Sequence, residues 1–69
     1  MQDLHKDATY SIESSAKCVL ARASHEGRIA VAQGNQALAE HYEMIAYLSR
    51  MILEAVDDVA AEVQAAVKK

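Results

Sequence analysis

The stretch GNQALAEHYEMIAYLSRMILEAVDDV, residues 34–59, indicates the architecture because it joins a helix break to a seven-residue apolar repeat. Gly34 supplies the left-handed backbone conformation that ends a helix, and Asn35 can cap the free amide groups that begin the next one. Beyond this pair, apolar residues recur at the spacing of a coiled coil. They are Leu38, Ile45, Ile52, Val59 and Ala66, with Tyr42, Leu48, Ala55 or Val56, and Val63 between them. We therefore expect a turn at residues 34–35 and a helix over about residues 36–67.

The first half of the chain carries a second helical pattern, on a narrower face built from smaller residues. Spacings of three, four and seven relate Leu4, Ala8, Ile12, Ala16, Val19, Ala23 and Ala30. The absence of proline and the presence of only two glycines leave little to interrupt a helix. Gly27 is an alternative end for this helix, but RIAVAQ continues the helical composition and short connections are common. The sequence thus predicts one all-α domain, residues 1–69, folded as an antiparallel two-helix hairpin whose first helix covers about residues 4–33.

The second predicted helix is apolar on more sides than one neighbouring helix can cover. Met44, Tyr47 and Met51 widen the apolar surface beyond the heptad positions. A hairpin has no further layer to cover that surface, and a chain of 69 residues buries little core alone. We therefore expect a homodimer in which two hairpins form a four-helix bundle. The predicted dimer core consists of Leu38, Ile45, Leu48, Ile52, Val56, Val59 and Val63.

Composition and charge argue against several classes of protein. Cys18 is the only cysteine, so an intrachain disulfide is impossible; we expect it to be a small structural residue, with a reactive thiol beside Lys17 as the alternative. The first ten residues lack the apolar segment of a signal peptide and no window resembles a membrane span, which favours a cytoplasmic protein without membrane contact. Residues 35–69 hold six acids and three bases, and the chain has no basic stripe for direct nucleic-acid binding.

Two motifs at the start of the second helix invite a functional interpretation. AEHYE resembles a metal helix of ferritin-like proteins, but those sites need Glu-x-x-His, whereas Glu40 and His41 are adjacent and about 100° apart on a helix. The GN turn between small residues resembles one tetratricopeptide unit, yet no second copy of the repeat is present. The histidines, His5, His25 and His41, lack a nucleophile partner. We expect a polar face beside the turn, no enzymatic activity, no metal and no cofactor.

An acidic run on the second helix is the strongest candidate for a binding surface. Glu54, Asp58 and Glu62 stand four residues apart and form one ridge, with Asp57 beside it. One interpretation is a solvated outer face. The other is that the ridge meets a basic surface on another protein, such as a DNA-binding domain. Arg28, Tyr42 and Tyr47 are added as candidate partner contacts because arginine and tyrosine often anchor interfaces.

In length and helical character, the chain resembles small phage-encoded inhibitors, and within them the quorum-sensing anti-activators. The resemblance implies a non-enzymatic module in the host cytoplasm that binds a quorum-sensing transcription activator and blocks its attachment to DNA. It transfers no functional residue to this sequence. The alternatives are a structural or assembly subunit and a ferritin-like metal-binding bundle.

Overall fold

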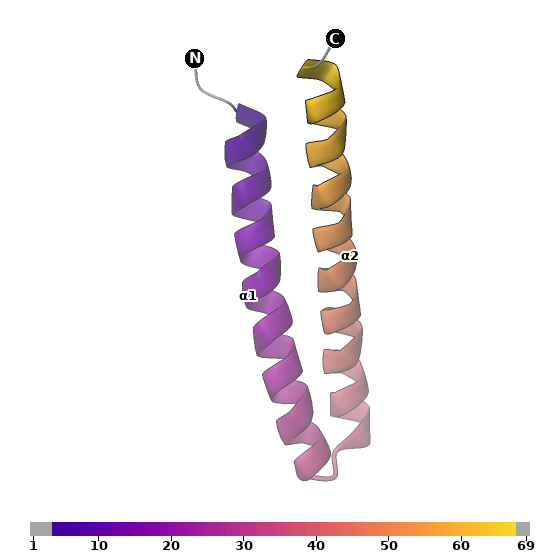
Figure 1. The fold of residues 1–69 in the computed structure, drawn as a ribbon. Coiled ribbons are helices and arrows are strands. Elements are labelled where there is room, and N and C mark those ends of the chain that lie inside the picture. Colours follow the sequence, from indigo (N-terminus) through magenta and orange to yellow (C-terminus); the bar gives the residue numbers. More distant parts are fainter. Residues whose placement is uncertain (1–3, 68–69) are drawn as a thin grey trace.

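The computed structural model describes residues 4–67, and the side chains of residues 8–67. Within this range the chain forms two α-helices, α1 (Leu4–Ala32) and α2 (Gln36–Val67), and no strand. They run side by side in opposite directions and meet at a short loop (Figure 1). The predicted all-α hairpin is confirmed. The first helix ends at Ala32, one residue before the expected position.

The loop forms through the backbone chemistry expected of its glycine and asparagine. Gly34 has a φ of 75°, and the amides of Gly34 and Asn35 donate to the carbonyls of Val31 (3.0 Å) and Ala30 (2.9 Å), the Schellman pattern. The Asn35 side chain then accepts a hydrogen bond from the amide of Leu38 at 3.1 Å and caps α2. Gly27, the alternative helix end, lies inside α1.

Small residues fill the contact between α1 and α2. The buried residues are Ala16, Ala23 and Ala30 on α1, and Ala39, Ala46, Ser49 and Val56 on α2. Ser49 is satisfied within its own helix, because its hydroxyl donates to the carbonyl of Ile45 at 2.9 Å. Short side chains allow the helix backbones to approach closely, but each one removes little apolar surface from water. The core inside one hairpin is therefore thin.

Most of the larger apolar residues flank this contact, although Val56 is buried in it and Leu20 and Leu53 are half-buried. Leu38, Ile45, Leu48, Ile52 and Val59 are between 38% and 49% exposed. Of the predicted dimer core, only Val56 is buried in the single hairpin, and Val63 is half-buried. The hairpin closes on the adjacent alanine repeat, which begins at Ala39, because the smaller side chains permit the closer approach. A place for the larger residues in a dimer core stays a prediction.

The hairpin is long and thin. Its dimensions are 54 × 18 × 10 Å, and its radius of gyration is 16.0 Å, against about 11 Å for a compact domain of this length. The chain exposes 5576 Å² of surface, whereas about 4,250 Å² is expected for a compact monomer of 7.5 kDa. One hairpin thus leaves roughly 1,300 Å² more surface in water than a compact protein of its mass.

Candidate functional site

The two long sides of the hairpin differ in chemistry. Ile52 stands four residues before the buried Val56, and Arg50 stands four residues after the buried Ala46. Successive residues are about 100° apart around a helix, so a residue four positions before a buried one lies about 40° to one side of it, and a residue four positions after lies about 40° to the other side. Ile52 and Arg50 therefore lie on opposite flanks of the contact between the helices. One flank is apolar and the other is charged.

The apolar flank, which we call the apolar face, consists of Ile12, Val19, Ile45, Ile52 and Val59. Ile12, Val19 and Ile52 line one shallow groove between the helices, and Ile12, Ile52 and Val59 line the next. Ile45 lies two helical turns before Ile52 on the same side. Neither groove has an aspartate, glutamate, lysine or arginine in its lining. This face therefore offers an uncharged surface along both helices as far as Val59, where the next hollow is lined by Asp58 and Glu62.

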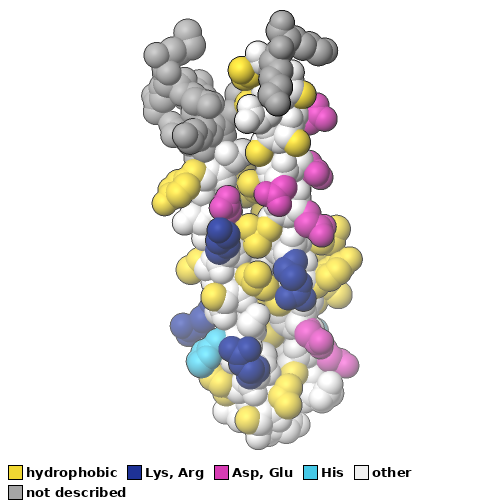
Figure 2. All heavy atoms as spheres, in the orientation of Figure 1, with side chains coloured by type: hydrophobic (Ala, Val, Ile, Leu, Met, Phe, Trp, Pro, Cys, Tyr) yellow, Lys and Arg dark blue, Asp and Glu magenta, His cyan; other side chains and the backbone are white. Residues whose placement is uncertain are grey.

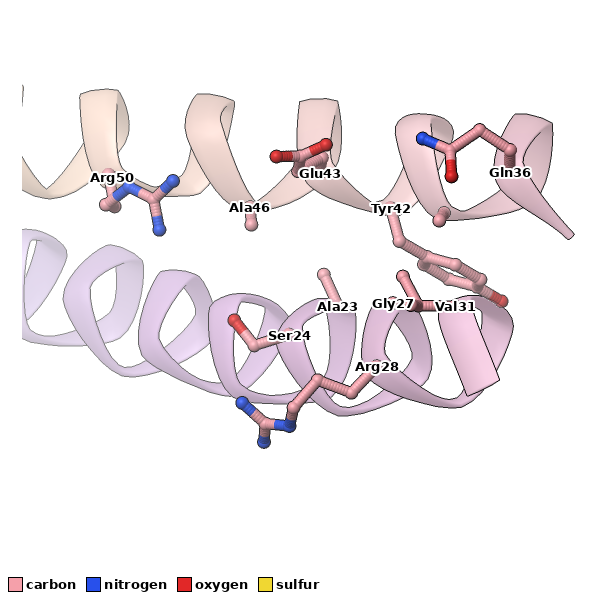
Figure 3. A pocket seen from close by; sticks show the side chains of 11 residues that line it. Ala23, Ser24, Gly27, Arg28, Val31, Gln36, Tyr42, Glu43, Ala46 and Arg50 are labelled. Carbon is pink, nitrogen blue, oxygen red and sulfur yellow. The ribbon is translucent and has the colours of Figure 1, made fainter. Parts of the chain in front are cut away.

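The charged flank contains a larger hollow near the loop, of about 380 Å³. We call it the arginine groove, and Figure 3 shows its walls. Its polar lining is Ser24 and Arg28 from α1 and Gln36, Tyr42, Glu43 and Arg50 from α2. Its floor is low because the helices meet there through Ala23, Gly27, Ala39 and Ala46. A Cβ at Gly27 would lie 3.4 Å from the Cβ of Tyr42, so the helices are already in contact below the groove.

The arginines of this groove differ from the other described basic residues in their pairing. Lys17 pairs with Glu13 at 3.1 Å and Arg22 with Glu26 at 3.6 Å, each along one face of α1. Within residues 8–67, neither Arg28 nor Arg50 forms an ion pair. The groove thus holds two cationic side chains, one from each helix, and one carboxylate, Glu43, with which neither arginine forms an ion pair.

The acidic ridge, Glu54, Asp58 and Glu62, is exposed over its whole length. Acidic side chains gather over the part of α2 toward its C-terminal end, whereas most basic side chains on this side lie nearer the loop (Figure 2). Asp57, also exposed, stands next to the ridge. None of these four carboxylates takes part in an ion pair within the described residues. The hairpin is therefore polarised along its length.

The structure brings together some of the residues predicted to bind a partner and separates others. Arg28 and Tyr42 line the arginine groove, whereas Tyr47 is exposed outside it. The acidic ridge forms a second, distinct surface. Sequence reasoning missed Arg50, which could be recognised only as the residue that follows the buried Ala46 by one turn.

Cys18 is exposed, so the expectation that it packs as a small structural residue in the hairpin is wrong.

Other kinds of site find no support in the described part of the chain. No group of three or more histidine, cysteine, aspartate and glutamate residues there could hold a metal ion. Neither α1 nor α2 contains a stretch with the length and apolar character needed to cross a membrane. No family model, no curated protein and no solved structure matches this chain. A functional proposal therefore depends on the surfaces of the hairpin.

Proposed function

We propose that this protein is a non-enzymatic protein-interaction module, which dimerises through its apolar face and uses its charged surfaces to bind and inhibit a larger protein. The observation that carries the proposal is the apolar face itself. Its isoleucines and valines are between 41% and 48% exposed, whereas five of the seven buried residues in the described part of the chain are alanines.

A second copy of this chain is the partner that we propose for the apolar face. Its apolar residues repeat every seven positions along α2, so two identical faces can interdigitate around a two-fold axis. No charged side chain of the two grooves would have to be desolvated. The product is a four-helix bundle.

The acidic ridge is proposed as the surface that contacts the larger protein. It is exposed along α2, where Asp58 and Glu62 border Val59 of the apolar face, and its carboxylates form no ion pair within the described residues. A dimer presents the ridge twice, which would attract a basic surface and speed the encounter. The resemblance to phage-encoded anti-activators suggests the DNA-binding surface of a quorum-sensing transcription activator. Occupation of that surface would exclude DNA.

Affinity capture with matched baits tests this partner proposal. Asp58→Lys reverses a charge in the ridge, whereas Glu40→Lys makes the same charge change on an exposed residue at the loop end of α2. We expect the wild type and Glu40→Lys to retain the same bacterial protein at physiological salt, and Asp58→Lys to lose it. The captured protein should release its DNA when the wild type is added. If both variants retained the captured protein equally, the proposed role of the ridge would be contradicted. That result would favour an assembly subunit that interacts only through its apolar face.

A further inference from the structure

We infer that the arginine groove is a binding site for an acidic helix of a partner protein. The inference goes beyond the proposed function because it assigns a second surface, of opposite charge to the acidic ridge, and a partner segment of defined chemistry. Its evidence lies in the two unpaired arginines, the open floor of the groove and the shape of the hollow.

The two arginines provide the charge recognition. Arg28 belongs to α1 and Arg50 to α2, so only the folded hairpin places both in one groove. In Figure 3 the Arg50 guanidinium lies on the side of α2 that faces α1, whereas the Arg28 side chain runs along α1 and ends at the edge of α1 farther from α2. Guanidinium groups match the geometry of carboxylates and form two parallel hydrogen bonds with them. Because neither arginine forms an ion pair within the described residues, an incoming carboxylate would not have to break one.

The floor and walls of the groove provide the apolar part of the site. Alanine and glycine line the floor, so a side chain from outside can pack on it without meeting a large side chain. Tyr42 is half-buried and adds an aromatic wall next to Gly27. A hollow of about 380 Å³ lies within the range of typical binding pockets, roughly 300–1,000 Å³. The site therefore suits an apolar residue that stands beside an acid.

A helix is the segment that best fits this shape. The groove lies between two antiparallel helices, and such a groove accepts the ridge of a third helix. The contact between Gly27 and Tyr42 sets the register of the two helices and places Arg50 level with Val19, about 13 Å along the hairpin from Arg28. Acids about two turns apart on the third helix would therefore face the two arginines, and an apolar residue between them would pack on the floor. Glu43 also lines the groove and would repel an acid placed next to it. This carboxylate helps to fix the position at which the acidic helix binds.

The acidic ridge of another copy also has acids at a spacing that suits the arginine groove. Its binding there, however, would have a different consequence for assembly. A contact between the ridge of one molecule and the groove of the next joins two different surfaces, and such a contact continues into an open chain of molecules. The proposed two-fold dimer is closed. We therefore assign the groove to an acidic helix of a different protein.

Nuclear magnetic resonance with a synthetic probe tests the assignment. The probe is an acetylated peptide of about 16 residues, long enough to form helix when bound, with glutamates four apart and leucines between them. A second peptide carries glutamine at each glutamate position. We expect the acidic peptide to shift the amide signals of Ser24, Gly27 and Tyr42 in a saturable way, and the glutamine peptide to bind about tenfold more weakly or not at all.

Variants with matched charge changes complete the test. Arg28→Gln and Arg50→Gln should each weaken binding of the acidic peptide by about tenfold, since each removes a charge-assisted contact. Arg22→Gln is the control because Arg22 pairs with Glu26 and does not line the groove; it should change the affinity less than about twofold. Circular dichroism should show unchanged helicity in all three variants.

Three results would overturn the assignment. They are equal binding of the glutamine peptide, signal shifts confined to the apolar face, and equal weakening by Arg22→Gln. A fourth would reassign the site to a second copy: growth of the wild-type particle at low salt that both Arg50→Gln and Asp58→Lys abolish. None of these results depends on capture through the acidic ridge, so failure of the proposed function and failure of this site can be told apart.

Discussion

The substitution Ile52→Ala measures whether the apolar face is covered in solution. Ile52 is 44% exposed in the single hairpin. Its change to alanine removes three carbon groups, each of which contributes about 0.8 kcal/mol when fully buried. Because the side chain is partly exposed, the free energy of unfolding of a monomer should fall by roughly 1 kcal/mol. Within a four-helix bundle the side chain would be enclosed, and the cost should rise to about 2–5 kcal/mol per chain.

The neighbouring Met51 is the matched control for this measurement. It is 47% exposed, close to the value for Ile52, but it does not line either groove of the apolar face. Urea unfolding followed by circular dichroism gives the free energy of unfolding for both variants at one protein concentration. We expect Ile52→Ala to cost at least about 1 kcal/mol more than Met51→Ala. Equal costs, with an unfolding midpoint that does not change with protein concentration, would refute the covered face.

Three substitutions test the loop and the contact between the helices by the same unfolding measurement. Gly34→Ala should destabilise the hairpin by about 1–2 kcal/mol, since a φ of 75° is strained for alanine; no change would mean that the loop adopts another conformation. Asn35→Ala should cost about 1 kcal/mol through loss of the cap on the amide of Leu38, and a cost near zero would remove that cap from the account. Ser49→Ala should be neutral or slightly stabilising, because its hydroxyl bonds only within its own helix. A loss above about 1 kcal/mol would show a further partner.

The sequence was sufficient to predict the hairpin because its signals are local. The left-handed glycine, the asparagine cap and the long uninterrupted heptads are chemical properties of neighbouring residues, and the structure contains the turn and both helices. Local signals also limit what can be inferred about long-range contacts. Two heptad repeats run along α2 side by side, one starting at Leu38 and the other at Ala39. Hydrophobicity would place the first repeat in the contact between the helices, whereas close approach of the two helices places the second repeat there.

The candidate binding surfaces were predictable only where one helix forms them. The acidic ridge is a pattern of residues four apart on α2 and is visible in the sequence. The arginine groove joins α1 to α2, so its composition depends on which repeat closes the hairpin. Arg28 and Tyr42 were selected for their residue types, and their meeting with Arg50 follows only from the observed packing.

The mass of the particle in solution shows whether two hairpins associate through the apolar face. Sedimentation equilibrium at micromolar concentration should give twice the 7.5 kDa of one chain for the wild type. Met51→Lys should keep that mass, and Ile52→Lys should reduce it to the monomer because a charge would enter the apolar face. A wild-type particle of 7.5 kDa that remains helical at this concentration would contradict the account.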